Sequence, residues 1–97
     1  MRAARPRTDS NQTAIVKALR SAGASVQSLA STGAGCPDLL VGHRGSNHLM
    51  ELKDGTLPPS RRRLTKDQVA WHRCWYGTVQ IVSSVEEALA VLGEGWG

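Results

Sequence analysis

Several features are scarce in this chain of 97 residues, and each scarcity narrows the class of protein. There are only two cysteines, Cys36 and Cys74, which is too few for the disulfide framework of a small secreted domain. No apolar run approaches about 20 residues, so no segment is expected to span a membrane. The N-terminal arginines precede no apolar stretch, which argues against a secretory signal. A reduced, cytoplasmic setting is therefore expected.

Aromatic residues are also few. Phe is absent, whereas there are three tryptophans, Trp71, Trp75 and Trp96, so the indole rings are expected to fill the larger gaps of the interior. Trp71 and Trp75 share one face of a predicted helix, and we interpret them as core residues rather than as platforms for stacked bases. At this length the chain is expected to be one domain, near the lower limit for burying an adequate core unaided.

The charge balance favours a negatively charged partner. Twelve Lys and Arg residues against eight Asp and Glu give a formal net charge of +4. Such an excess is typical of proteins that bind polyanions, although basic charge is also common on inert surfaces.

Hydrophobic periodicity and capping signals predict an α/β fold with the element order α-β-β-β-α-β-α. We expect a small mixed β-sheet flanked by helices. Residues 1–8 are expected to be a flexible basic arm, and residues 9–97 a single domain. The expected helices span residues 9–22, a segment from 66 onward, and 85–92, and the expected strands span 25–29, 39–41, 49–53 and 79–82.

Three residues near the centre of the chain suit one kind of chemistry: Asp38, Glu51 and Lys53, here called the Asp-Glu-Lys motif. Alternate side chains of a strand share a face, so Glu51 and Lys53 project the same way. Two carboxylates suit a Mg²⁺ ion, and a neighbouring Lys can orient or help deprotonate a metal-bound water. Hydrolysis of a phosphodiester requires these groups.

A hairpin is expected to join the two halves of the motif. With Gly45-Ser46 at the centre of a type II′ turn, Leu39 pairs with Leu52 on an apolar face and the motif lies on the opposite face. A slip of one residue would mix the two faces. Each half of the motif also has an ordinary explanation, because Asp after Pro commonly begins a turn and Glu-x-Lys is common on solvated strands.

Pro37-Asp38 followed by Glu51-Leu52-Lys53 resembles the core signature of the PD-(D/E)XK nuclease superfamily. The wider context, residues 35–42 and then 64–68 before a helix, is most similar to the VRR-NUC branch, particularly its small stand-alone phage and bacterial forms. This resemblance implies a restriction-endonuclease-like core and a Mg²⁺- or Mn²⁺-dependent endonuclease that hydrolyses DNA, with no organic cofactor. It also implies a homodimer acting on branched, flap or Holliday-junction DNA in the cytoplasm of a bacterial or phage-infected cell.

The resemblance also implies roles for individual residues. Asp38 and Glu51 would hold the ion together with the backbone carbonyl of Leu52, Lys53 would serve the attacking water, and Gln68 would match a Gln that this branch carries on a helix. One departure concerns the first helix, where relatives often place an additional acidic ligand. Here the segment 9–12 reads Asp-Ser-Asn-Gln, so that Asp9, Asn11 and Gln12 remain open as contributors to the metal shell.

Two neighbouring segments have competing interpretations. The run Arg61-Arg62-Arg63, with Lys66 beyond it, is expected to grip phosphates, the alternative being a solvated linker. Gln68 stands three residues after Thr65, which makes a helix capping box, so its amide has a structural explanation beside the catalytic one. His72 lies one turn further on the same face and is interpreted as a core or surface residue.

Two other functions remain open. One is a nucleic-acid-binding module with the nuclease fold and little activity, which the missing acidic ligand of the first helix and the basic run favour. The other is a zinc site, which the absence of a Cys-x₂-Cys pair disfavours. Its candidate ligands are Cys36, His43, His48, His72 and Cys74.

Overall fold

The structure, a computed structural model, describes residues 8–93 of the chain. Its elements follow the order α-β-β-β-α-β-α that the sequence predicts, with a short 3₁₀ turn before β2 and another before α2. The helices are α1 (Thr8–Ser21), α2 (Lys66–Cys74) and α3 (Val85–Leu92), and the strands are β1 (Ser25–Ser28), β2 (Leu39–His43), β3 (Ser46–Leu52) and β4 (Gln80–Val82). The predicted basic arm lies outside the described residues except for Thr8, with which α1 begins.

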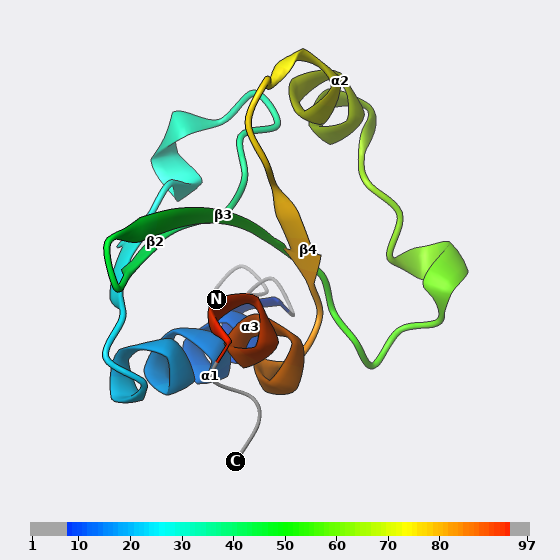
Figure 1. Cartoon of the computed structure of the whole chain (residues 1–97). Coiled ribbons are helices and arrows are strands. Elements are labelled where there is room, and N and C mark those ends of the chain that lie inside the picture. The colour runs from blue at the N-terminus through cyan, green and yellow to red at the C-terminus, as the bar shows by residue number, and fades with distance from the viewer. Residues whose placement is uncertain (1–7, 94–97) are drawn as a thin grey trace.

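The four strands form one mixed sheet in the order β1-β2-β3-β4. The first three pair antiparallel, whereas β4 returns parallel to β3 after a crossover that contains α2. Helices α1 and α3 lie together against one face of the sheet, and α2 lies over the other face (Figure 1). The domain is therefore a small α/β fold whose sheet separates a paired-helix side from an α2 side.

The hydrophobic core lies between the sheet and the pair α1 and α3. Ile15 and Leu19 occupy one face of α1 at helical spacing and are fully buried. They pack against the alternate residues of the central strands, among them Leu39, Val41 and Met50, which are equally buried. Burial of each such side chain contributes about 1.5–3 kcal/mol, so this layer fixes how the central hairpin sits on the helices.

The expectation that tryptophans fill the interior is wrong for the two that the structure describes. Helix α2 has no buried residue, and 46% of Trp75 is exposed. Trp71 and Trp75 stack on each other instead of entering the core, whose volume aliphatic side chains fill. Trp96 lies outside the described residues.

The central hairpin forms as predicted, but with a different turn. Leu39 pairs with Met50 rather than with Leu52, and the chain reverses between His43 and Ser46. Its two turn residues, Arg44 and Gly45, have φ values of 51° and 81°. Positive φ at both central positions is the geometry of a type I′ turn, which matches the twist of the strands. Because the register differs by two residues rather than one, every side chain keeps its predicted face.

The capping box expected at the start of α2 is confirmed. Thr65 and Gln68 form a reciprocal capping box at the start of α2. The side chain of Ser84 accepts a hydrogen bond from the Glu87 backbone N–H, and Gly93 ends α3 in the left-handed conformation. None of the helices within residues 8–93 has the length and apolar character that crossing a membrane requires.

Candidate active site

The Asp-Glu-Lys motif meets at one end of the central hairpin, on the face of the sheet that α2 covers. Asp38 immediately precedes β2, Glu51 is the penultimate residue of β3, and Lys53 follows that strand. Together with Gln68 of α2, the three side chains line a cavity of about 240 Å³. The alternation of strand side chains therefore brings the motif to one place, as the sequence predicts.

The hairpin itself fixes Asp38. Its carboxylate oxygen Oδ2 accepts a hydrogen bond of 2.7 Å from the backbone N–H of Leu52. Its own backbone N–H donates to the carbonyl of Met50 at 3.1 Å. These two bonds tie the acid at the start of β2 to the strand that carries Glu51.

Gln68 connects α2 to both strand residues of the motif. Its amide nitrogen Nε2 donates to Glu51 Oε2 at 2.9 Å, and its oxygen Oε1 accepts from Lys53 Nζ at 2.7 Å. The same Oε1 accepts from the backbone N–H of Thr65 at 2.8 Å, completing the capping box. The capping interpretation of Gln68 is therefore confirmed, and the same amide also bonds Glu51 and Lys53 of the motif.

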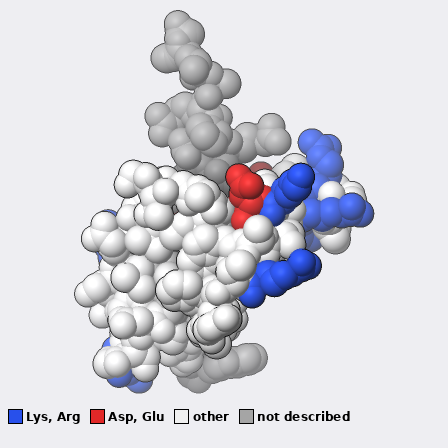
Figure 2. Space-filling model, turned by 90° about the horizontal axis from the view of Figure 1, so that it is seen from above, with Lys and Arg blue, Asp and Glu red and all other residues white. Residues whose placement is uncertain are grey.

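Only part of the basic segment reaches the cavity. Arg61 and Arg62, on and just after the second 3₁₀ turn, line it beside the acidic residues. Arg63 and Lys66 are exposed and do not line it. In Figure 2, Lys and Arg side chains gather at one side of the face around a small acidic patch, and most of the remaining surface is uncharged. The basic run is thus divided between the cavity and the surrounding surface.

Glu51 is the most perturbed acid of the site. Only 1% of the residue is exposed. The pKa of Glu51 is raised from its ordinary value of 4.5 to about 8. The largest cause is burial, followed by the negative charge of Asp38 and by a hydrogen bond between the two carboxyl groups when one is protonated. The positive charge of Lys53 opposes this rise. At neutral pH the acidic pair therefore retains a proton unless a cation takes its place.

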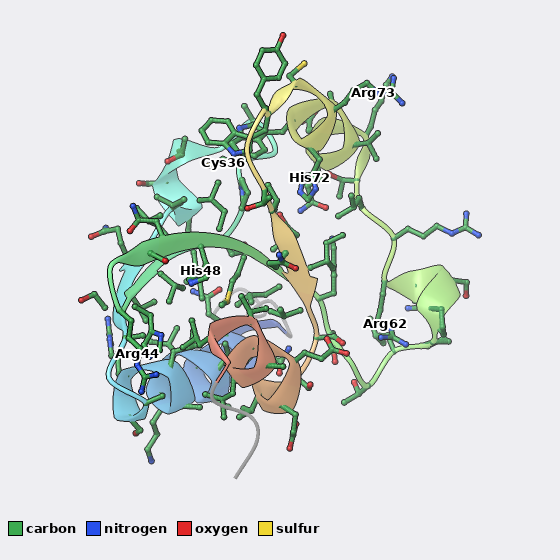
Figure 3. All side chains as sticks on the ribbon, viewed as in Figure 1. Cys36, Arg44, His48, Arg62, His72 and Arg73 are labelled. Carbon is green, nitrogen blue, oxygen red and sulfur yellow. The ribbon has the colours of Figure 1, made fainter. Side chains whose placement is uncertain are left out.

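His72 faces Glu51 from α2. Figure 3 shows His72 extending from the helix toward the sheet. Its Nε2 lies 3.9 Å from Glu51 Oε1, and both atoms are buried without a hydrogen-bond partner in the part of the chain that the structure describes. The sequence alone predicts His72 to be a core or surface residue, because its spacing of four residues from Gln68 is the only feature that connects it to the site.

The donors present fit a hard divalent cation. Carboxylate and carbonyl oxygens are the ligands that Mg²⁺ prefers, and Asp38, Glu51 and the Leu52 backbone line the same cavity. The buried Glu51, with its raised pKa and its unpartnered Oε1, would be stabilised as a carboxylate by a bound cation. Residues 8–93 contain no cluster of three or more His, Cys, Asp or Glu side chains. The protein therefore supplies two carboxylates, and backbone oxygens and water would have to complete the shell.

The first helix contributes neutral groups to the edge of this site. Asn11 donates its side-chain N–H to the carbonyl of Lys53 at 3.0 Å, and Gln12 lines the cavity. Asn11 thus holds the backbone at the end of the motif. The side chain of Asp9, the third candidate of this segment, lies outside the described part of the chain.

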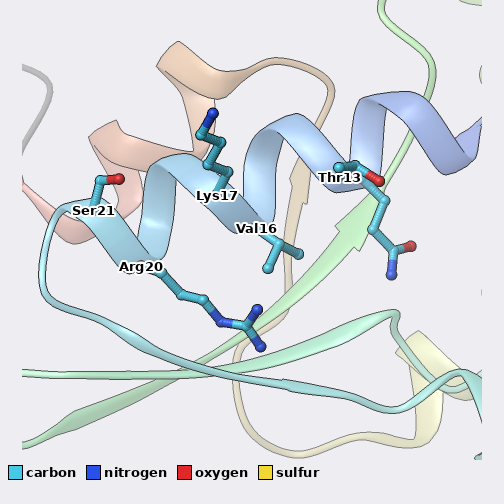
Figure 4. Close-up of a pocket in the computed structure, with 6 residues that line it drawn as sticks. Thr13, Val16, Lys17, Arg20 and Ser21 are labelled. Atoms are coloured by element: carbon cyan, nitrogen blue, oxygen red, sulfur yellow. The ribbon is translucent and has the colours of Figure 1, made fainter.

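The remaining candidates are dispersed. His43 is buried among the strand residues that face α1, on the opposite face of the sheet from the motif. Both cysteines are free thiols, so nothing in residues 8–93 supports the zinc alternative. A further hollow, on α1, is lined by Lys17 and Arg20, which point in different directions (Figure 4). Arg20 donates there to the carbonyl of Val26, and the hollow contains no acid.

Comparison of the chain with family models, with curated proteins and with solved structures finds no match.

Proposed function

We propose that this protein is a metal-dependent endonuclease that hydrolyses phosphodiester bonds of DNA. The observation that carries the proposal is the convergence of Asp38, Glu51, Lys53 and Gln68 on one cavity, joined by hydrogen bonds. The cavity combines two carboxylates, an ammonium group and two arginines, a set that suits a divalent cation and a phosphate together.

Each residue has a separate task in this proposal. Asp38 and Glu51, with the carbonyl of Leu52, hold a Mg²⁺ or Mn²⁺ ion, which supplies Lewis-acid stabilisation of the phosphate and lowers the pKa of water. Lys53 orients the attacking water and takes part in its proton transfer. Gln68 holds the Lys53 ammonium group, so that it stays beside the acidic pair.

Arg61 and Arg62 position the phosphate in this proposal. They approach the cavity from the loop before α2. Contacts of this kind fix the register of a nucleic acid without reading its sequence. A substrate defined by its shape, such as branched, flap or four-way-junction DNA, is consistent with them.

The fold gives this proposal further support. The order α-β-β-β-α-β-α, with an acid before the second strand and Glu-x-Lys at the end of the third, is what a restriction-endonuclease-like core of the VRR-NUC type would have. On that basis we extend the proposal to a homodimer that acts on DNA in the cytoplasm of a bacterial or phage-infected cell.

A nicking assay tests the function. Linear duplex, single-stranded, flap and four-way-junction DNA are incubated with Mg²⁺ or Mn²⁺ and the wild-type, Asp38→Asn, Glu51→Gln or Lys53→Met protein. Each variant is expected to lose cleavage while keeping its fold, whereas Lys17→Ala, at a residue of α1 that does not line the cavity, retains it. Full activity in Glu51→Gln would exclude this mechanism.

A second candidate is a DNA-binding module without cleavage. The neutral Asn11 and Gln12 at the edge of the site favour it, because they add no charge for a metal ion. Salt-sensitive DNA binding with no cleavage in either metal would support this candidate. Cleavage that depends on Glu51 would exclude it.

A further inference from the structure

A second hollow lies on the α2 side of the sheet, next to the acidic cavity but separate from it. It has a volume of about 590 Å³, and none of its lining residues carries a charge. Its lining includes Trp71 of α2 and Trp75 directly after that helix, together with Leu40 and Leu49 of the central strands. We propose that this groove, here called the Trp groove, binds an unpaired nucleobase of the DNA strand whose phosphate lies at the Asp-Glu-Lys motif. The inference rests on the proposed function for the identity of its ligand.

The two indole rings form a preorganised stacking platform. Their centroids lie 4.7 Å apart with an interplanar angle of 19°, so each ring holds the other in place. Trp75 nevertheless leaves 46% of its surface exposed. A nucleobase presents a flat π-face of any sequence, and stacking on aromatic side chains is the usual means by which proteins hold unpaired bases. Because the two rings are already ordered in the free protein, binding a base does not add the entropy cost of immobilising them.

The chemistry of the lining suits a base rather than a phosphate. Asn47, Thr32 and Thr78 bring an amide and two hydroxyl groups to an otherwise apolar groove. These groups can both donate and accept hydrogen bonds, as the edges of a nucleobase require. The absence of charge from the lining leaves the anionic backbone to Arg61 and Arg62 at the neighbouring cavity.

The shared elements place the groove beside the acidic cavity. On β3, Leu49 lies two residues before Glu51, and strand residues at that spacing share a face about 7 Å apart. On α2, Gln68 bonds the motif while Trp71, with Trp75 directly after the helix, lines the groove. A strand that crosses α2 with its phosphate at Glu51 therefore has a neighbouring base within reach of the indoles. Duplex DNA has no free base for this position, so the groove selects flaps and single strands.

The test measures stacking directly. A short single strand containing 2-aminopurine, whose fluorescence falls when it stacks, is titrated with protein in Ca²⁺ in place of Mg²⁺. The wild-type protein is expected to quench the probe. Trp75→Leu keeps an apolar side chain but removes the π-face, and it is expected to abolish the quenching and weaken binding about tenfold. The matched control is Tyr76→Leu, an adjacent aromatic that is fully exposed and lies outside the groove, and it is expected to behave as wild type.

The outcomes separate this inference from the proposed function. Quenching that depends on Trp75 in a protein without cleavage would support the groove and reject the nuclease. Normal cleavage with equal quenching and affinity in wild type and Trp75→Leu would overturn the groove. A fall in sedimentation mass of DNA-free Trp75→Leu would also overturn it, because the occupant would then be a second copy of the chain. If Trp75→Leu fails to fold, Thr78→Val preserves the indoles and is expected to weaken base binding through loss of its hydroxyl.

Discussion

The amide of Gln68 links the stability of a helix to the geometry of the site. It bonds Glu51 and Lys53 on one side and the backbone N–H of Thr65 on the other. The sequence leaves capping and catalysis as alternatives for Gln68 because it does not contain the distance between α2 and β3. The interaction also fixes the side-chain orientation of Lys53, a long flexible residue that would otherwise sample many rotamers.

A pair of substitutions separates the two roles of Gln68. Gln68→Ala is expected to reduce nicking by roughly 10- to 100-fold, as loss of a residue that orients metal-site groups usually does. Thr65→Ala removes the hydroxyl cap and costs about 1 kcal/mol of stability, but it leaves the bonds of Gln68 to Glu51 and Lys53. Activity and thermal unfolding are measured on both proteins. If Gln68→Ala and Thr65→Ala lose equal activity and equal stability, Gln68 would act only as a helix cap.

The raised pKa of Glu51 predicts an unusual pH dependence of the metal-free protein. Folded Glu51 binds its proton up to about pH 8, whereas an unfolded glutamate releases it near 4.5. The folded state therefore binds more protons in this range, and the free energy of unfolding falls as pH rises from about 5 to about 8. The slope contributed by this group is at most about 1.4 kcal/mol per pH unit. Thermal unfolding in EDTA across this range measures it.

Glu51→Gln provides the control for that dependence. The amide cannot ionise, so the difference between wild type and variant isolates the contribution of Glu51 from that of every other group. Wild type is expected to lose stability relative to the variant as pH rises. Parallel curves for the two proteins would contradict the raised pKa.

Calorimetry of Mg²⁺ binding is expected to show release of a proton near pH 7, because the cation replaces it.

At the scale of helices and strands, short sequence patterns are sufficient to predict the features that depend only on neighbouring residues. The caps of α2 and α3, and the buried stripe of α1 at Ile15 and Leu19, follow from side chains a few residues apart. The predicted turn of the hairpin is wrong because Gly45 fits the first central position of a type II′ turn as well as the second central position of a type I′ turn, and the strand twist favours both types. The predicted faces of the strands are nevertheless correct, because the alternation of apolar residues such as Leu39 and Val41 assigns them independently of the turn.

A glycine in the loop before Asp38 controls how closely α2 approaches the site. A Cβ added at Gly35, whose φ is +84°, would overlap the main chain of Asp67. Gly35→Ala is therefore expected to displace the start of α2, separate Gln68 from Lys53, and lower nicking more than stability. Gly93→Ala is the matched control, because its φ is +80° but its Cβ would meet nothing within 4 Å.

Activity and thermal unfolding of the two glycine variants measure this coupling between loop and helix. Both substitutions carry the cost of a positive φ, about 1 kcal/mol. Only Gly35→Ala adds the overlap with α2. Similar activity in the two variants would show that the approach of the loop to α2 does not hold Gln68 in place.

The whole molecule assigns separate tasks to the two faces of its sheet. The face toward α1 and α3 is apolar and carries the core, whereas the face toward α2 carries the Asp-Glu-Lys motif and the Trp groove. Alternation along β2 and β3 made this division predictable from sequence. The tryptophans were wrongly interpreted as core because composition counts large apolar residues but not the face they occupy. Burial of Glu51, and its proximity to His72, depend on how α2 crosses the sheet, which no local pattern encodes.

The charge distribution predicts how salt affects DNA binding by the whole protein. If Arg61 and Arg62 neutralise phosphates, replacing both with Ala lowers the slope of log affinity against log salt concentration by about 0.9 for each duplex phosphate that is no longer neutralised. The charge-matched control replaces Lys17 and Arg20 of the α1 hollow, which changes the net charge equally but away from the motif. Fluorescence anisotropy with labelled DNA in Ca²⁺ measures both slopes. A reduction confined to the first double variant supports phosphate binding at the cavity, whereas equal reductions would attribute binding to the net charge of the protein.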